Sequence, residues 1–189
     1  MEEKKPVLFF IAIIPPQEIV EEINSFKHDF SGRFGSKAAL KVIPHITLKA
    51  PFKIPLEEQD SLMKWFDQLE WKALPFSVEL KNFSCFPKKH APVVFIQPVK
   101  SPGLEQLQKF IVGAFHKQYP GMKIPENEID FHPHITIAYR DLKPEQFEAA
   151  WKEYKTKKYN ASFLAGGFCL LQHDEKQWNI IASKKCHME

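Results

Sequence analysis

A five-residue motif occurs twice in this chain and constrains its fold more than any other feature. Pro-His-Ile-Thr-Leu at residues 44–48 is repeated as Pro-His-Ile-Thr-Ile at residues 133–137. Each copy alternates polar and apolar residues, which is the period of a half-buried β-strand. The histidine and threonine of each copy therefore share one face of a strand, while the two apolar residues anchor the opposite face to a core. The sequence predicts two similar strands, one in each half of the chain, that each present a histidine beside a threonine.

Apolar periodicity predicts further strands and helices around the two motifs. In chain order, we expect a central strand at residues 7–14, a helix containing Ile19 to Phe30 and ended by Ser31-Gly32, a motif strand at 40–50 stopped by Pro51, a helix after Pro55, a strand at 76–80, a loop at 82–89, a strand at 93–99, a helix from Leu104 to Phe115, a polar loop at 121–130, the second motif strand at 131–139, a helix from Pro144, and a closing hairpin of strands 161–172 and 177–183. Gly166 and Gly167, inside the first strand of that hairpin, predict a bulge or a close approach of two backbones.

The unit of helix, motif strand and helix occurs twice in this order, which indicates a duplicated fold. We expect an α+β protein with pseudo-two-fold symmetry, in which two antiparallel sheets pack together around a central groove and the helices lie outside. A length of 189 residues fits a single domain of two intimately packed lobes over residues 1–189, with His45 in one lobe and His134 in the other.

Charge and cysteine content limit the classes of function. The net charge of +3 is compatible with a phosphate-bearing ligand but is not by itself typical of a nucleic-acid-binding protein. Cys85, Cys169 and Cys186 are odd in number and widely spaced, so a disulfide framework or a zinc site is not expected. The apolar run at residues 7–14 is too short to span a membrane and reads as a buried strand rather than a signal peptide. We expect a soluble, cytoplasmic protein.

The two motif histidines suit acid-base catalysis at phosphorus. An unperturbed imidazole has a pKa near 6.5, so one ring can act as a base while the other acts as an acid. The hydroxyls of Thr47 and Thr136, one step along each strand from His45 and His134, would hold the non-bridging phosphate oxygens. Because no Asp/Glu cluster is evident beside either histidine, we expect no metal ion and no other cofactor.

Four further residues are candidates for substrate contacts. Lys49 and Arg140 continue the two motif strands on the histidine face, where either cation could meet substrate phosphates. A solvated strand end is the alternative for both. Phe83 and Phe86 lie in the predicted loop and could stack on a base. Packing within the core or the loop is the alternative for these two rings.

At these residues the sequence resembles the 2H phosphoesterase superfamily, whose mark is a pair of His-x-Thr/Ser-x motifs. They stand here as His45-Ile46-Thr47-Leu48 and His134-Ile135-Thr136-Ile137. Residues 8–16, 44–52 and 83–99 are also similar to the opening strand, first motif and central strand of the LigT-like branch, the bacterial "2′-5′ RNA ligase" group. The resemblance covers most of the chain.

The resemblance implies a bilobal fold with both histidines in the central groove. It implies metal-independent hydrolysis of a cyclic phosphodiester, typically a 2′,3′-cyclic phosphate at an RNA end, to a 2′-phosphate. By the same resemblance, His45 acts as the general acid on the O3′ leaving group and His134 activates water. LigT-like proteins commonly have an arginine soon after the second motif, whereas here Ala138-Tyr139 precede Arg140, and Arg33 is the only other arginine. These two departures leave a small cyclic nucleotide or another phosphodiester open as the substrate.

Two other functions remain open from the sequence. The same site could join RNA ends through a 2′-5′ linkage by the reverse chemistry, or it could belong to a non-catalytic module that binds a nucleotide or RNA. A Ser-His-Asp hydrolase is not supported, because the chain has no GxSxG motif. We expect an RNA end or a small cyclic nucleotide as the partner, no membrane, no obligate protein partner, and a monomer.

Overall fold

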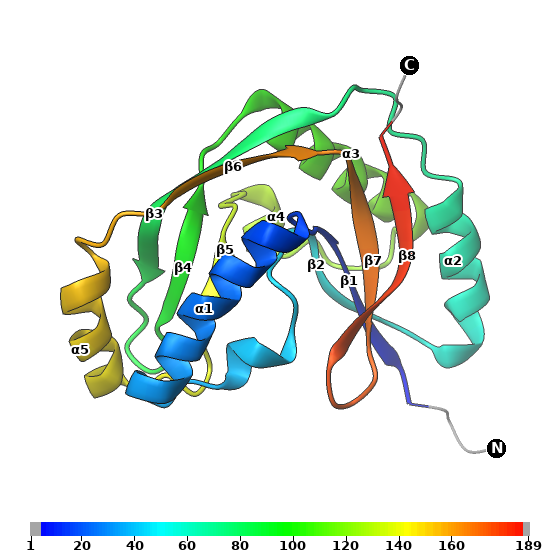
Figure 1. The fold of residues 1–189 in the computed structure, drawn as a ribbon. Helices are drawn as coiled ribbons and strands as arrows, with labels where there is room; N and C mark the ends of the chain where they lie inside the picture. The colour runs from blue at the N-terminus through cyan, green and yellow to red at the C-terminus, as the bar shows by residue number, and fades with distance from the viewer. Residues whose placement is uncertain (1–4, 187–189) are drawn as a thin grey trace.

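Two four-stranded antiparallel sheets form the body of the molecule in a computed structural model that describes residues 5–186 (Figure 1). Sheet A has the strand order β2-β1-β7-β8, and sheet B has the order β5-β4-β3-β6. The strands are β1 (Val7–Ile13), β2 (Ile46–Ile54), β3 (Phe76–Phe86), β4 (Val93–Pro98), β5 (Ile135–Ala138), β6 (Asn160–Ala165), β7 (Gly167–His173) and β8 (Trp178–Lys185). The expected α+β fold with two antiparallel sheets is confirmed.

Helices cover the two sheets and share one hydrophobic core with them (Figure 1). They are α1 (Gln17–Phe34), α2 (Gln59–Asp67), α3 (Pro102–Gln118), α4 (Glu126–Ile129) and α5 (Pro144–Tyr154), with short 3-10 helices η1 (Ala38–Lys41) and η2 (Leu56–Glu58). The predicted stripes are buried, as Ile23 of α1 and Leu107 of α3 illustrate. Within residues 5–186, no helix combines the length and the hydropathy that a membrane crossing requires.

The order of elements is repeated in the two halves of the chain. The first half runs β1-α1-β2-α2-β3 and the second runs β4-α3-β5-α5-β6. Both motif strands, β2 and β5, are edge strands that pair with the first strand of their own half. Helix α1 contacts β5, and α3 contacts β2, so each long helix packs against the motif strand of the other half. These two helix–strand contacts pack the two halves of the chain against each other beside the motif strands.

The first motif strand begins and ends later than the sequence predicts. Residues 38–41 form η1, and β2 then continues through Pro51 to Ile54. A proline cannot donate a hydrogen bond to a neighbouring strand, but β2 is an edge strand and Pro51 is exposed, so this missing donor costs little. Helix α1 also runs past Gly32 and ends at Gly35, whose φ of 70° is the left-handed conformation common at helix ends.

The predicted loop at residues 82–89 is wrong in its first half, because β3 extends to Phe86. Asn82 takes a positive φ of 58°, and the pairing of β3 with β4 shifts register between Leu80 and Phe83. The strand therefore continues through a bulge, which interrupts the alternation of buried residues that the sequence displays. The polar loop at 121–130 likewise contains the short helix α4.

The predicted strand at residues 161–172 is two strands that belong to different sheets. β6 pairs with β3 in sheet B, and after Gly166 the chain continues as β7, which pairs with β1 and β8 in sheet A. A Cβ atom on Gly167 would lie 2.1 Å from the carbonyl oxygen of Lys184, so only glycine fits here. The expected close approach of two backbones is confirmed at Gly167.

Candidate active site

The first motif histidine is held by its own chain segment. His45 directly precedes β2, and its Nδ1 lies 2.7 Å from the carbonyl oxygen of Ile43. A carbonyl can only accept a hydrogen bond, so Nδ1 carries the proton and Nε2 remains free. The ring packs against Phe10 of β1, with 4.7 Å between ring centroids. These contacts fix both the tautomer and the orientation of the imidazole.

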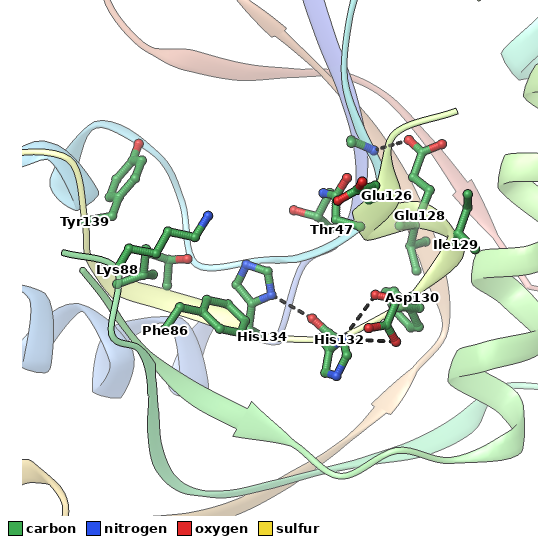
Figure 2. Close-up of a pocket in the computed structure, with 16 residues that line it drawn as sticks. Thr47, Phe86, Lys88, Glu126, Glu128, Ile129, Asp130, His132, His134 and Tyr139 are labelled. Carbon is green, nitrogen blue, oxygen red and sulfur yellow. Dashed lines mark hydrogen bonds and ion pairs between the residues drawn. The ribbon is translucent and has the colours of Figure 1, made fainter. Parts of the chain in front are cut away.

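The second motif histidine is held in the same manner. Nδ1 of His134 lies 2.7 Å from the carbonyl oxygen of His132, which again leaves Nε2 free. Phe86 and Phe95 pack against the ring, each with 5.4 Å between centroids. Figure 2 shows the other ring nitrogen of His134 directed away from His132 and into the open pocket.

A cavity of about 780 Å³ lies in front of His134 (Figure 2). Thr47 and Thr136 both line it, so the structure brings the two motif threonines to one cavity. His45 is not among the lining residues, but the charge of His134 is close enough to contribute to the lowered pKa of His45. One cavity therefore combines groups from both motifs, with Thr47 from the first and His134 and Thr136 from the second.

Burial makes both histidines weaker bases than free imidazole. The pKa of His45 is lowered to about 4, mainly by burial, with smaller contributions from the charges of Lys27 and His134. The pKa of His134 is also lowered, mainly by burial and further by the charge of His132. Both rings are therefore neutral at pH 7 in the free protein. A bound anion would raise both pKa values, because it stabilises the protonated rings.

Lys27 of α1 is an unusual neighbour of the first motif. Its side chain is buried, and its Nζ donates a hydrogen bond of 2.8 Å to the carbonyl oxygen of Val42. Burial lowers the pKa of Lys27 to about 7. This hydrogen bond fixes the backbone at Val42. The next residue, Ile43, has the carbonyl that orients His45.

Lys49 does not reach the cavity. The pairings of Ile11 with Lys49 and of Ala12 with Thr47 skip Leu48, so β2 contains a bulge at this point. The bulge changes the alternation of faces, and the Lys49 ammonium is buried 2.7 Å from a carboxylate oxygen of Glu128. The structure thus gives Lys49 a buried ion pair in place of the expected substrate contact.

The two candidate phenylalanines have different surroundings. Phe83 is buried in the core, 5.0 Å from Phe26 and 4.9 Å from Tyr154 between ring centroids, so it is not available to stack on a base. Phe86 lines the cavity beside His134. The two residues are three positions apart in β3, so the alternation of a strand places their side chains on opposite faces of sheet B.

Arg140 lies beyond the end of β5, where the backbone has left the strand conformation. Its φ is 59°, and its guanidinium lies 5.0 Å from the centre of the Tyr139 ring. Tyr139 lines the cavity, whereas Arg140 is exposed and is not part of the lining. The predicted continuation of the strand face from Thr136 to Arg140 is therefore wrong.

Several lining residues are absent from the sequence prediction. Lys88 lies at one side of His134, and His132, Asp130 and Glu126 lie toward α4 on the other side (Figure 2). His132 stands two residues before His134, so the period of a strand is a usable signal for it. Lys88 follows shortly after β3, in the predicted loop, where no pattern marks it. Glu126 and Asp130 have no signal either, because nothing in the sequence places α4 beside the motifs.

Comparison with solved structures identifies the fold. E. coli LigT complexed with 3′-AMP has a TM-score of 0.68 at 19% identity, over 97% of this chain and 100% of that chain. The protein TT0787 of Thermus thermophilus has a TM-score of 0.63 at 17% identity, over 96% of this chain and 99% of that chain. The fold is therefore that of LigT.

Relatives identified by sequence indicate the family to which the chain belongs. Proteins of Bacillus cytotoxicus and Geobacillus kaustophilus, each named "Putative phosphoesterase", are both 28% identical and cover 90% of this chain and 91% of their own length. The sequence model described as "2'-5' RNA ligase superfamily" matches residues 15–177. The chain thus belongs to the 2′-5′ RNA ligase superfamily, the 2H phosphoesterases.

Proposed function

We propose that this protein hydrolyses a 2′,3′-cyclic phosphodiester to a 2′-phosphate, with His45 and His134 as the acid-base pair. The observation that carries the proposal is the shared tether of the two rings: each Nδ1 is engaged by a backbone carbonyl, so each Nε2 is free for proton transfer. Two threonine hydroxyls at the same cavity provide donors for the phosphate.

In the proposed reaction, Nε2 of His134 removes a proton from water as its oxygen attacks phosphorus. The bond from phosphorus to O3′ breaks, and Nε2 of His45 gives its proton to that oxygen. Thr47 and Thr136 donate hydrogen bonds to the non-bridging oxygens. Solvent then returns a proton to His45 and takes one from His134, so the net change is the addition of one water molecule. His45 must gain its proton when the anionic substrate binds, because it is neutral in the free protein at pH 7.

The substrate we propose is either an RNA end or a small cyclic nucleotide. Phe86 and Tyr139 offer aromatic surface near His134, and Lys88 offers a cation on the same side of the cavity. E. coli LigT has been crystallised with 3′-AMP and with ATP, so nucleotides are the compounds to test first.

The test is turnover of a 2′,3′-cyclic mononucleotide and of an oligonucleotide with a 2′,3′-cyclic phosphate end, both in EDTA. We expect a 2′-phosphate product, and a loss of about 10²-fold or more in kcat for His45→Ala and for His134→Ala. Activity retained by both variants would refute the two-histidine mechanism. The ratio of kcat/KM for the two substrates assigns the substrate class.

The same experiment separates two alternatives. A ligated product formed from the cyclic end and an oligonucleotide with a 5′-hydroxyl would favour RNA-end joining by the reverse chemistry. Tight binding of nucleotides without turnover would favour a non-catalytic binding module. The free Nε2 atoms favour catalysis, because binding alone does not require a proton donor and a proton acceptor at one phosphate.

A further inference from the structure

Two carboxylates connect the segments that carry the motifs, and neither belongs to a motif. The first is Glu128 of α4, which lies shortly before His134 in the chain. Its Oε1 accepts hydrogen bonds from Lys49 Nζ at 2.7 Å and from the backbone N–H of Ala50 at 2.9 Å. Lys49 and Ala50 belong to β2 and directly follow the first motif. Glu128 therefore connects the segment just before the second motif to the residues just after the first motif.

Helix α3 completes the surroundings of this carboxylate. His116 Nε2 lies 3.3 Å from Glu128 Oε2, and the side-chain amide of Gln108 donates to the Glu128 carbonyl at 3.0 Å. The carboxylate and its Lys49 partner are each only 2% exposed. Figure 2 shows Glu128 on the α4 side of the cavity, with His134 between it and Lys88. This is a buried, fully engaged connection between α4, α3 and β2.

The second carboxylate is Asp141, which lies shortly after β5. Its Oδ1 accepts a hydrogen bond of 2.8 Å from the hydroxyl of Ser36, which is buried. Its Oδ2 accepts bonds of 2.8 and 2.9 Å from the backbone N–H groups of Lys37 and Ala38. These three residues join α1 to η1 and precede the first motif. Asp141 therefore connects the segment just before the first motif to the residues just after the second motif.

Each connection joins the segment before one motif to the segment after the other. In the part of the chain that the structure describes, the sheets do not join the two motif strands. β2 and β5 are edge strands of different sheets, and no β-ladder joins them within residues 5–186. In-line displacement needs an acid and a base on opposite sides of phosphorus, and a misplacement of about 1 Å can cost roughly 10²-fold in rate. The spacing of the two histidines therefore needs contacts that cross from one motif segment to the other.

We propose that Glu128 and Asp141 are positioning residues that set the separation and mutual orientation of His45 and His134. The proposal rests on the proposed function, because the spacing matters for rate only if both histidines act on one phosphate. Neither carboxylate contacts the reacting atoms; each acts through the segment that it binds.

Asp141→Ala is the main test variant, since Asp141 is exposed and its loss leaves no buried charge unpaired. Asp141→Asn is the conservative variant, because an amide can still offer oxygen to the two N–H groups and NH₂ to the serine hydroxyl. For Glu128, the double variant Glu128→Gln/Lys49→Met avoids a buried unpaired ammonium. Asp29→Ala is the matched control: Asp29 accepts from Tyr154 Oη at 2.7 Å and pairs with Arg33, so it links α1 to α5 through residues outside both motifs.

The kinetic measurement is kcat and KM for a 2′,3′-cyclic mononucleotide, in the wild-type and His45→Ala backgrounds. We expect Asp141→Ala to lower kcat about 10-fold or more in the wild-type background, and less than about 2-fold in the His45→Ala background. Asp141→Asn should restore most of the rate. Glu128→Gln/Lys49→Met should behave like Asp141→Ala. Equal losses in both backgrounds, or the same loss for Asp29→Ala, would overturn the proposal.

A structural measurement separates failure of this proposal from failure of the proposed function. Crystal structures of the wild type and of Asp141→Ala give the distance between the Nε2 atoms of His45 and His134. We expect a change of about 0.5 Å or more, the tolerance within which catalytic groups must be held. An unchanged distance would overturn the positioning role even if the wild type turns over substrate, whereas an inactive wild type with a changed distance would refute only the proposed reaction.

Discussion

His45 and His134 are held by the same hydrogen bond at equivalent positions, with each Nδ1 2.7 Å from the carbonyl oxygen two residues earlier. The residue between carbonyl and histidine is Pro44 in one copy and Pro133 in the other. Proline has a fixed φ and no N–H, so it stiffens the approach without adding a donor that would compete for that carbonyl. In each motif, the proline thus restricts the backbone whose carbonyl accepts the hydrogen bond from the histidine Nδ1.

The lowered pKa values of the two histidines predict an acidic optimum for kcat/KM. In the proposed reaction, the free enzyme needs His45 protonated and His134 neutral. The protonated form of His45 is lost as pH rises above its pKa of about 4. The pKa of His134 is also lowered, which moves the other limb to acidic pH. We expect a bell-shaped profile centred below pH 6.5, and a higher optimum for kcat, because the bound phosphodiester raises both pKa values. An optimum of kcat/KM above pH 7 would contradict this assignment.

Lys27 should reduce stability near neutral pH. Its folded-state pKa of about 7 lies below its ordinary value of 10.5, so the unfolded chain binds more protons between these values. The free energy of unfolding should therefore rise as pH increases from about 7 to about 10. We expect Lys27→Met to raise the free energy of unfolding by about 1–2 kcal/mol at pH 7 and to abolish that rise. Urea unfolding at several pH values measures both effects, and Lys53→Met, at an exposed site, is the control that should show neither.

The motif threonines should act on rate and not on folding. Removing the hydroxyl from Thr47 or Thr136 by substitution with Val removes a donor to the phosphate, and we expect kcat to fall about 10²-fold with little change in Tm. The matched control is Thr156→Val, because that hydroxyl bonds only to the carbonyl of Glu153 at the end of α5. Rates close to wild type in both motif variants would remove the threonines from the mechanism.

Phe83 and Phe86 should separate stability from substrate binding. Phe83→Ala leaves a cavity in the core, so we expect a loss of about 3–5 kcal/mol in the free energy of unfolding and no change in KM for the folded fraction. Phe86→Leu keeps apolar volume but removes the aromatic face beside His134, so we expect KM for a cyclic nucleotide to rise several-fold with a smaller loss of stability. Unfolding curves and steady-state kinetics on the same two proteins provide the comparison.

The duplicated motif is sufficient to predict the fold class, because a repeated strand pattern in two equivalent settings implies two equivalent lobes. It also identifies the strand faces that carry Thr47 and Thr136, since alternation holds over two residues. It fails for Lys49 and Arg140, further along the same strands. A bulge at Leu48 and the positive φ of Arg140 interrupt the alternation, and neither has a local signal in the sequence.

Contacts between distant segments are beyond sequence reasoning. Glu128 and Asp141 read as ordinary polar residues of a loop and a strand end, and their roles depend on which segments the fold places beside them. The same holds for Lys27, whose charge lies on the buried face of a helix and interrupts its apolar stripe. A single sequence gives the type of each residue and its local period, but not the partner that the tertiary structure supplies.

Sheet A joins strands that are far apart in the sequence, with β1 and β2 within residues 7–54 and β7 and β8 within residues 167–185. During synthesis, β1 therefore has no second neighbour until β7 has left the ribosome. The segment before His45 packs on this sheet, so the first half of the site cannot reach its final form any earlier. For the proposed reaction, a nascent chain that already carries both histidines is thus expected to be inactive, and activity should arise only when the hairpin of β7 and β8 closes.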